Sequence, residues 1–468
     1  MQLPRPVRTP HSPRLPALLL ACAVLAAPSA QALELIEAWR AALRHDPQYA
    51  AARAARDAGQ TGDAQAAALW RPQLQLEAGA GAATLDSRTR GAQFSAPGFG
   101  SAAGARFDSL IEDGTQTHYG LSLRQPLYDR ERLAQGRQLR IQADSAELAW
   151  ADAQQQVMLR SAELYFELAL ADRRLALLAR QKDAVERTAR EAQARFTLGS
   201  LPVTDLHEAT AQAASLRAQH LAARTERELQ RQALADLIGQ MPDPATLSLP
   251  ARTPDTTTLA PLEHWLERAA RHNSALQAAQ ARVDGAEQEV RKTSGPLSAS
   301  VDLVARHGRE KLSGDNDLGA ASYSAEQNVI GLQLAVPLYT GGARSARQDE
   351  ARARLSQAQA ELDHGRLQIA RQIRAAWLTL TVGGEQASAL AAAAEASQAR
   401  LAATRIGRQT GERSTQDLLD AENAAAAAEL ALARMRAELF IQHLRLAALA
   451  GQLDEARFQQ AAATLARR

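Results

Sequence analysis

Residues 124–136 read RQPLYDRERLAQG, and residues 335–347 read AVPLYTGGARSAR. Each stretch follows a run of alternating apolar residues, passes through Pro-Leu-Tyr, and opens into a long tract rich in alanine, arginine, glutamine and glutamate. Apolar residues at every second position predict a strand, and a long tract without proline or glycine clusters predicts a helix. The sequence therefore predicts two places where a strand turns directly into a long helix. The residues that mark these strand-to-helix joints are Pro126, Tyr128, Pro337 and Tyr339.

Other features recur at the same spacing as the joints. Pro126 and Pro337 are 211 positions apart, and LIGQ at 237–240 resembles LAGQ at 449–452, 212 positions later. The helix-breaking stretches FTLGSLPVTDLHEA and RQTGERSTQDLLDA are also 212 positions apart. Several landmarks at one spacing predict an internal duplication. The predicted organisation is a signal peptide at 1–32, a first structural repeat at 33–241, a linker at 242–260 and a second structural repeat at 261–468.

RHDP at 44–47 resembles RHNS at 271–274, but here the offset is 227 positions. The first repeat therefore carries about fifteen extra residues before its joint, which we expect in a loop. Each repeat has the same predicted order: a first helix, two strands around a Gly/Ser/Asp-rich loop, a long helix of about 65 residues and a last helix. The expected first helices are 34–70 and 261–293, the strands about 72–84, 115–128, 297–308 and 327–339, and the loops about 85–113 and 309–325.

The long helices each measure roughly 100 Å at about 1.5 Å per residue. Their apolar residues step by four and three positions, which is the spacing of a coiled-coil seam. In the first long helix this seam consists of Leu164, Leu168, Ala171, Leu175 and Leu178. Such a seam predicts packing against a partner helix and carries no chemistry of its own.

The N-terminus predicts export. Three arginines precede the apolar stretch 16–27, and Ala30-Gln31-Ala32 supplies small residues for cleavage, the pattern of a secretory signal peptide. A second reading makes Cys22 a lipidated first residue. No later stretch offers 18 uninterrupted apolar residues, so any crossing of a membrane is expected to use strands. Lys+Arg 54 against Asp+Glu 52 gives a net charge of +2, which argues against nucleic acid as a partner.

Four strands of ten to twelve residues suit a tilted crossing of a bilayer. In lipid every backbone polar group must be paired, and an open sheet of four strands leaves two unpaired edges. Four strands are also too few to close around a lumen. The predicted fold is therefore an α+β membrane protein, in which each chain gives four strands to an oligomeric transmembrane β-barrel and long helices to a coiled-coil barrel.

The chain resembles the TolC family of outer-membrane channel proteins over residues 33–460. The resemblance rests on LELIEAWRAALRHDPQY at its start, on the two joints and on the two helix-breaking stretches. It implies a homotrimer with a barrel of twelve strands and a long helical barrel in the periplasm of a Gram-negative bacterium. It also implies docking through a periplasmic adaptor (membrane fusion) protein onto an inner-membrane transporter, ABC or proton-driven, for type I protein secretion or drug efflux.

The same resemblance implies that the helix-breaking stretches form the periplasmic tip. Asp417 and Asp420 correspond to two aspartates that ring the entrance, and a spacing of three places them on one side of a helix. Three subunits then gather six carboxylates, which attract multivalent cations. Thr204, Asp205 and Arg413 correspond to contacts of the closed state. The alternative is that Thr204 and Ser414 are ordinary helix N-caps.

One position departs from the family pattern. Where the family has an aromatic residue this chain has Arg408, although Phe196 keeps the aromatic at the equivalent place of the first repeat. We expect Arg408 to form a salt bridge with Asp205 of a neighbouring helix in the closed state.

The sequence offers no set of catalytic residues, no metal ligands and no cofactor motif, so we expect a protein that is not an enzyme. The alternative from another class is a periplasmic coiled-coil adaptor or scaffold, which would fractionate as a soluble protein. The exported cargo and the partner pump are not specified by the sequence.

Overall fold

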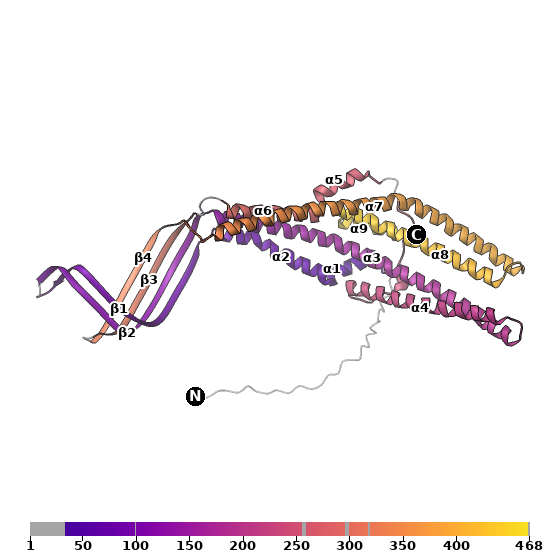
Figure 1. Ribbon diagram of the computed structural model, residues 1–468, viewed down its shortest axis with the longest axis horizontal. Coiled ribbons are helices and arrows are strands. Elements are labelled where there is room, and N and C mark those ends of the chain that lie inside the picture. Colours follow the sequence, from indigo (N-terminus) through magenta and orange to yellow (C-terminus); the bar gives the residue numbers. More distant parts are fainter. Residues whose placement is uncertain (1–32, 99, 255–258, 295–298, 317–318, 467–468) are drawn as a thin grey trace, which may run out of the picture.

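In a computed structural model, the described residues are 33–98, 100–254, 259–294, 299–316 and 319–466. The predicted signal peptide at 1–32, including Cys22, lies outside the described residues. The molecule is elongated: a bent sheet forms one end, and a bundle of helices runs from the sheet to the other end (Figure 1).

The elements occur in the predicted order, twice along the chain. The helices are α1 (Leu35–His45), α2 (Pro47–Ala68), α3 (Arg130–Thr197), α4 (Val203–Ile238), α5 (Leu262–His272), α6 (Ser274–Thr293), α7 (Ala343–Gln409), α8 (Thr415–Leu449) and α9 (Glu455–Ala466), with a short 3-10 turn at Pro244–Thr246. The strands are β1 (Gln73–Ala96), β2 (Gly100–Asp129), β3 (Ser300–Asn316) and β4 (Gly319–Ala335). Helix, helix, strand, strand, long helix and last helix therefore appear in both halves, while the duplication itself stays an inference from the sequence.

The expected first helix of each half is in fact two helices. The chain breaks at Asp46 in the first half and at Asn273 in the second, the third residues of RHDP and RHNS. Asp46 accepts hydrogen bonds from the backbone N–H groups of Gln48 and Tyr49, and Asn273 accepts one from Leu276. Each side chain therefore caps the start of the second helix, which ends the first helix one residue earlier.

The four strands form one antiparallel sheet in the order β1-β2-β3-β4. The prediction of loops at 85–113 and 309–325 was wrong, because most of these residues extend the strands into long hairpins. The extra residues of the first half likewise lengthen β1 and β2 and do not form a loop. Apart from Ile111 and Leu312, which are buried, most side chains of this extension are exposed on both faces, so no sustained apolar alternation marks it in the sequence.

The β1–β2 hairpin projects beyond the β3–β4 hairpin and is bent (Figure 1). The β1–β2 register shifts between Ala83 and Leu85, and the β2–β3 register shifts between Glu112 and Thr115, close to the end of the shorter β3–β4 hairpin. Asp113 has a positive φ of 47° at this place. Such a register shift is a β-bulge, which leaves a residue unpaired and bends the strand. The bulge therefore changes the direction in which the end of the hairpin projects.

One face of the sheet is apolar next to the helices, and the other is polar. The register places Leu74, Leu123, Leu303 and Leu332 on one face, where large apolar side chains are exposed in the single chain. The opposite face carries polar side chains, namely Gln75, Glu77, Ser122, His118, Arg124, Asp302, Arg306 and Gln333. An apolar face toward lipid and a polar face toward a lumen is the arrangement of transmembrane barrel strands.

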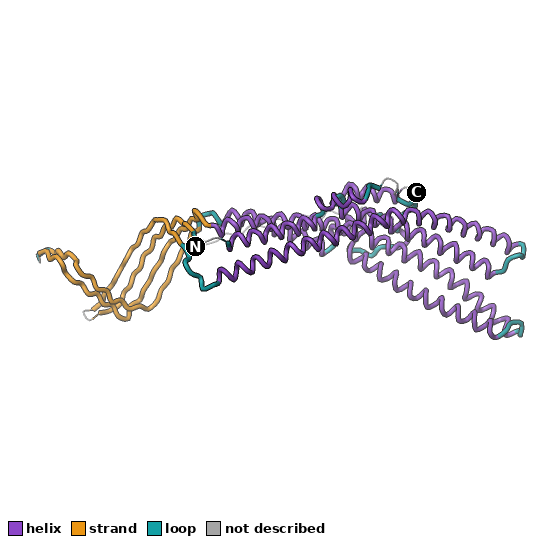
Figure 2. Tube along the Cα trace, turned by 45° about the horizontal axis from the view of Figure 1, so that its top comes forward, coloured by secondary structure: helices purple, strands orange, loops and turns teal. Residues whose placement is uncertain are grey.

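The long helices confirm their predicted length. Helix α3 has 68 residues and α7 has 67, so each is about 100 Å long. Helix α3 packs along α4, and α7 packs along α8, so that two helical hairpins end at the far end of the molecule (Figure 2). Along the predicted seam of α3, Leu168, Ala171 and Leu178 are buried.

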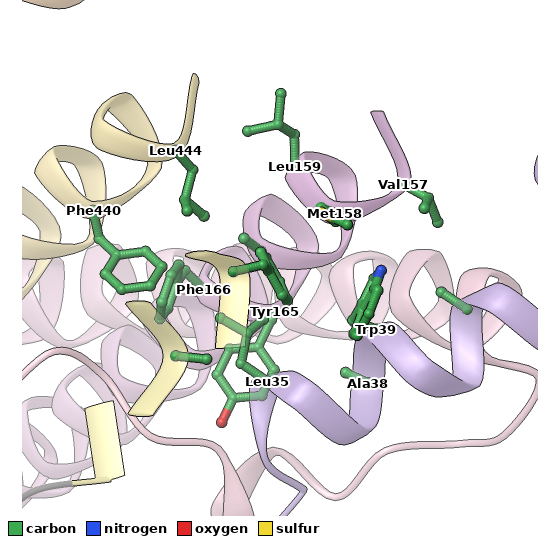
Figure 3. Close-up of a cluster of buried hydrophobic side chains, with 14 of the residues drawn as sticks. Leu35, Ala38, Trp39, Val157, Met158, Leu159, Tyr165, Phe166, Phe440 and Leu444 are labelled. Atoms are coloured by element: carbon green, nitrogen blue, oxygen red, sulfur yellow. The ribbon is translucent and has the colours of Figure 1, made fainter. Parts of the chain in front are cut away.

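The largest apolar core lies midway along the helices, where α1 and α9 pack against α3 and α8 (Figure 3). We call it the waist core, and its aromatic members are Trp39, Tyr165, Phe166, Phe440 and Phe458. The Phe166 and Phe440 rings meet edge to face at 5.2 Å, and Trp39 lies 5.4 Å from Phe458. This core fixes the two halves of the chain to each other, because Phe166 belongs to the first half and Phe440 to the second.

Helix α9, which the sequence analysis did not assign, completes the waist core with Phe458 and Leu465. Within the described residues, no helix combines the length and the apolar character that a membrane-crossing helix needs.

Candidate functional site

The first strand-to-helix joint is continuous. Strand β2 ends at Asp129 and α3 begins at Arg130, without an intervening loop. The Asp129 carboxylate accepts hydrogen bonds from the backbone N–H groups of Glu131 and Arg132 and pairs with the Arg132 guanidinium at 3.1 Å. An N-cap aspartate satisfies the free N–H groups of a helix start and favours its positive dipole end. One residue therefore ends the strand and starts the helix.

Pro126 does not end the strand ladder at this joint. Pro126 lies inside β2 opposite Asp302, and the register shifts between Pro126 and Tyr128. The shift inserts Leu127 as an extra residue, so that Tyr128 lies opposite Val301 on the apolar face. Without the bulge, an even-numbered residue of β2 would lie on the polar face. Proline without an N–H tolerates this irregular place in the ladder.

The second joint is built differently. Strand β4 ends at Ala335, two residues before Pro337, and α7 begins only at Ala343 after Gly341 and Gly342, both with positive φ. Tyr339 is 88% exposed in the single chain, whereas Tyr128 is 50% exposed. The expected strand 327–339 therefore runs four residues past the observed end of β4. The difference follows from the stagger of the strands. Ser300, the first residue of β3, lies opposite Asp129 of β2 but opposite Ala335 of β4, so β2 keeps its β3 partner up to the helix and β4 has no described partner beyond Ala335.

The first helix tip holds Thr204 and Asp205. Helix α3 ends at Thr197, Gly199 turns the chain with φ 72°, and α4 starts at Val203 after Pro202 as its N-cap. Thr204 lies inside the first turn and donates its hydroxyl to Asp205 at 3.1 Å, so the alternative that Thr204 is an N-cap was wrong. Both side chains are exposed at the tip, where a neighbouring helix has access to them.

The second helix tip holds Arg408, Arg413, Asp417 and Asp420. Gly411 turns the chain with φ 83°, and Ser414 caps α8, as the alternative for that residue expected. The Ser414 hydroxyl accepts a hydrogen bond from the backbone N–H of Asp417 at 3.0 Å. In return, the Asp417 carboxylate accepts one from the backbone N–H of Ser414 at 2.9 Å. This reciprocal capping box fixes the Asp417 side chain toward the start of the helix.

The capping box changes the acidity of Asp417. Hydrogen bonds from the Ser414 backbone and hydroxyl, with a smaller contribution from the charges of Arg413 and Arg400, lower the pKa of the Asp417 carboxyl below its usual value. These donors stabilise the carboxylate more than the acid. Asp420 lies one turn further along α8 and accepts a hydrogen bond from Gln416 at 3.1 Å. Both aspartates are solvent-accessible at the same tip, but their carboxylates have different hydrogen-bond partners.

The structure thus sorts the predicted tip residues into two groups. Thr204 and Asp205 lie at the end of the α3–α4 hairpin, and the other four lie at the end of the α7–α8 hairpin. The two ends lie side by side but apart at the same end of the molecule (Figures 1 and 2). Within the described part of the chain, Arg408 forms no ion pair with Asp205. A contact between them stays a prediction for the assembled protein.

Sequence reasoning missed an ion pair beside the first joint. Arg124 of β2 pairs with Asp302 of β3, whose side chain is 3% exposed. Nearby, Gln125 donates to the Trp70 carbonyl at 2.7 Å and Arg132 donates to the Leu69 carbonyl at 2.9 Å. These bonds tie the end of α2 to the joint. The only signal in the sequence was a charge within an alternating apolar run, at a position that the register between two distant strands decides.

Tyr165 and Trp377, which the repeat spacing aligns, make matching bonds. The Tyr165 hydroxyl donates to the Leu33 carbonyl at 2.9 Å, and the Trp377 indole donates to the Ala260 carbonyl at 3.1 Å. Leu33 and Ala260 are themselves 227 positions apart (260 − 33), which is the offset of the first helices. Each long helix is therefore hydrogen-bonded to the segment that directly precedes the first helix of the same half.

Comparisons with known proteins agree with this architecture. The sequence profile of the family described as outer membrane efflux protein matches residues 38–240 and 265–452. The proteases secretion protein PrtF of Dickeya chrysanthemi is 30% identical over 458 residues, which cover 95% of this chain and 94% of PrtF. The outer membrane protein TolC of Vibrio cholerae is 25% identical over 421 residues, covering 90% of this chain and 91% of TolC.

Solved structures show the same fold. The outer membrane protein VceC of Vibrio cholerae superposes with a TM-score of 0.65 at 21% identity, over 89% of this chain and 96% of VceC. The CmeC outer membrane channel of Campylobacter jejuni gives a TM-score of 0.67 at 16% identity, over 92% and 89% of the two chains. The family is one of transport channels rather than enzymes. With its two halves both matched by the profile, the chain belongs to the outer membrane efflux protein family of TolC-like channels.

Proposed function

We propose that this chain is the subunit of a passive homotrimeric exit duct. In this proposal the sheet crosses the outer membrane, and the helices extend into the periplasm toward an adaptor protein and an inner-membrane transporter. The observation that carries the proposal is the pair of free edges: β1 and β4 are each paired on one side only. Unpaired edges cannot face lipid, so the sheet requires further copies of itself.

The register within the chain gives the register between chains. Leu74 pairs with Leu123 in the first hairpin, and Val301 pairs with Leu334 in the second. The second pair follows from the first by the repeat offsets of 227 (301 − 74) and 211 (334 − 123). The two hairpins therefore have the same register, and the contact between the halves is a template for the contact between subunits.

The two halves of the sheet meet where β2 pairs with β3. The same offsets, applied to one β2–β3 residue pair, predict one residue pair at the subunit boundary. Gly120 of β2 lies opposite Gly308 of β3. The equivalent positions are Gly331 of β4 (120 + 211) and Gly81 of β1 (308 − 227). A Cβ atom added at either Gly81 or Gly331 would meet nothing within 4 Å in the single chain. We propose that Gly331 of one subunit lies opposite Gly81 of the next.

The helices favour the same arrangement. Leu378 and Val382 on α7 and Leu229 on α4 are more than half exposed in the single chain. The residues equivalent to Leu378 and Val382 are Phe166 and Leu170, which belong to the waist core beside α8. Because these three aliphatic side chains are already partly buried, burying the rest of each contributes roughly 1–2 kcal/mol. We therefore propose that α7 packs on α4 of the next subunit as α3 packs on α8 within the chain.

Cysteine cross-linking tests the ring. The only cysteine of the sequence, Cys22, lies in the predicted signal peptide, so introduced pairs are the reactive thiols. Gly81→Cys with Gly331→Cys, and Glu77→Cys with Ala335→Cys, are expected to give reducible dimers and trimers in outer membranes. Directly opposite residues of antiparallel strands have Cα atoms about 4.5–5.5 Å apart, within the range of a disulfide.

The matched control is Glu77→Cys with Gly331→Cys. These two positions are four residues out of the proposed register, about 13 Å along the strand, and should not cross-link. Cross-linking of this control alone would show that the ring exists with another register. A chain that fractionates as a soluble monomer after osmotic shock would reject the duct and favour the scaffold alternative.

For the cargo, we propose protein secretion as the first function to test. Two relatives are named for protease secretion, PrtF and the alkaline protease secretion protein AprF of Pseudomonas aeruginosa, which is 26% identical over 92% of this chain. A third, BepC of Brucella suis, is named an outer membrane efflux protein, so drug efflux is the second candidate. Deletion should remove a secreted protein from the medium. Increased antibiotic sensitivity with unchanged secretion would favour efflux.

A further inference from the structure

Two cations lie on the apolar face of the sheet at its far end. Arg309 and Lys311 of β3 are an even number of residues away from Leu303. Because side chains alternate along a strand, their side chains lie on the same, apolar face of the sheet as Leu303. Both side chains are exposed, and among the described residues neither takes part in an ion pair. Glu326 lies opposite Arg309 across the ladder, without an ion pair between them. An exposed arginine and lysine next to an apolar surface require a polar environment beside the lipid.

Tyrosines give the height of these cations. Tyr119 and Tyr128 lie on the apolar face of β2, nine positions apart. At about 3.3 Å per residue and a tilt near 40°, this spacing spans roughly 23 Å, close to the ~25 Å apolar band of outer-membrane barrels. Tyrosines at both limits of such a band correspond to its two interfaces. Arg309 lies directly opposite Tyr119. Lys311 lies opposite Thr117, two residues further along the strand from the helices.

The cations therefore lie at the level of the headgroups in the outer leaflet. Next to them, His307 of β3 and Asn328 of β4 share a hydrogen bond of 2.6 Å. These two polar side chains, which are the nearest to the apolar residues of the face, are therefore already paired within the sheet. Arg309 and Lys311 are two positions apart on one face, about 6.6 Å along the strand. This separation allows one phosphate to be held by both side chains, with the guanidinium offering two parallel N–H donors.

We propose that Arg309 and Lys311 form a binding site for the phosphate groups of a phosphorylated glycolipid in the outer leaflet. The site rests on the proposed function, because it needs the apolar face of the sheet to be in lipid and the helices to be periplasmic. It also explains why a strand that is apolar from Val301 to Ala305 on this face becomes basic immediately beyond. The opposite, polar face offers a control cation on the same strand, Arg306, which is also exposed and unpaired among the described residues.

The test uses the full-length oligomer and vesicles of phosphatidylcholine that contain lipopolysaccharide. A second set contains the same lipopolysaccharide with its lipid A phosphates removed. The wild type is expected to retain the phosphorylated form preferentially. The double variant Arg309→Gln with Lys311→Gln should lose about thirtyfold of this preference, at roughly fivefold per basic side chain near an anionic surface. Arg306→Gln should keep the preference.

Three results would overturn the site: an unchanged preference in the double variant, an equal loss in Arg306→Gln, or equal retention of both lipopolysaccharides by the wild type. Oligomers of the double variant must first be shown in the outer membrane by the Gly81–Gly331 cross-link. If the cross-link forms and the lipid preference is unchanged, only the lipid site fails. If the wild type forms no oligomer in the outer membrane, the proposed function fails instead.

Discussion

The side chains of Arg124 and Asp302 form an ion pair between two strands, but they are buried to very different extents. The guanidinium is 50% exposed, while the carboxylate is 3% exposed beneath it. The pair lies on the polar face, opposite the bulge at Pro126 and at the point where the sheet meets α3. It joins the first half of the chain to the second, next to the place where the barrel strand becomes a periplasmic helix.

Removing the two partners of this pair should therefore have unequal effects. Arg124→Gln leaves a buried carboxylate without a counter-charge and is expected to cost about 3 kcal/mol, whereas Asp302→Asn leaves an arginine that reaches water and should cost about 1 kcal/mol. The measurement is the midpoint of denaturant unfolding in lipid vesicles. Arg306→Gln on the same face is the control and should be neutral. Equal losses in the first two variants would mean that the burial of Asp302 has no energetic consequence.

Two glycines at equivalent ends of helices test the repeat geometry. Gly239 and Gly451 follow α4 and α8 with φ of 78° and 66°. A Cβ at Gly451 would lie 2.2 Å from the backbone oxygen of His272, and one at Gly239 would lie 2.5 Å from the ring of His45. A side chain can rotate away but a carbonyl cannot. Gly451→Ala is therefore expected to lower the free energy of unfolding by about 3 kcal/mol, more than Gly239→Ala.

The control for these variants is Gly411→Ala at the helix tip. Gly411 also has a positive φ, but its added Cβ would meet nothing within 4 Å. It should cost only the left-handed backbone penalty, about 1 kcal/mol. Thermal unfolding followed by the loss of helical circular dichroism ranks the three variants. A Gly451→Ala variant as stable as Gly411→Ala would contradict the close approach of α8 to His272.

The acidic entrance predicts a response to multivalent cations. If Asp417 and Asp420 of three subunits ring the entrance, changing both to Asn removes the charges that hold such ions. Single-channel recordings should then show that block by a trivalent cation is relieved, with the open conductance retained. Glu412→Gln, an exposed acid of the same turn outside the proposed ring, is the matched control. Block that persists with unchanged affinity in the double variant would reject the ring.

The capping box predicts how this block depends on pH. Because Ser414 lowers the folded pKa of Asp417, the stabilisation from this bond is present above the unfolded pKa and is lost as pH falls through the lower folded value. The carboxylate therefore stays ionised further into the acid range than an ordinary aspartate. Ser414→Ala removes the hydroxyl donor but keeps the backbone N–H, so the pKa of Asp417 should rise part of the way, and the pH at which cation block is half lost should rise with it. An unchanged midpoint would show that the Ser414 hydroxyl does not set the acidity of the group that holds the blocking cation.

Arg408 gives a separate prediction for the closed state. Its side chain is exposed at the α7–α8 tip, and Asp205 is exposed at the α3–α4 tip. If the two pair across neighbouring hairpins, Arg408→Ala should raise single-channel conductance and antibiotic leakage, and Asp205→Asn should do the same. Arg405→Ala, which instead breaks the 3.2 Å pair with Glu422 within one hairpin, serves as a comparison. Unchanged conductance in Arg408→Ala would contradict the pairing.

The predictions from sequence were confirmed for elements with a clear period and failed for those without one. The long helices and the apolar parts of the strands repeat every 3.6 or two residues, because one side is buried or faces lipid. Residues 85–113 lack such a pattern, because most side chains of the projecting hairpin are exposed on both faces, and so the sequence predicts a loop there. The helix start at Asp46 does have a signal in the sequence, because an aspartate directly before a proline is typical of a helix N-terminus.

The amino-acid sequence by itself predicted the repeat and determined the order of elements and the positions of the two joints, because these follow from neighbouring residues and their spacing. Only the tertiary structure decided that Asp302 is buried under Arg124, that the bulge after Pro126 turns Tyr128 to the apolar face, and that the first joint is continuous while the second is not. The physical reason is the register between distant strands: Arg124 and Asp302 are separated by 178 residues along the chain. Which side chains meet across that separation depends on how the whole sheet is paired.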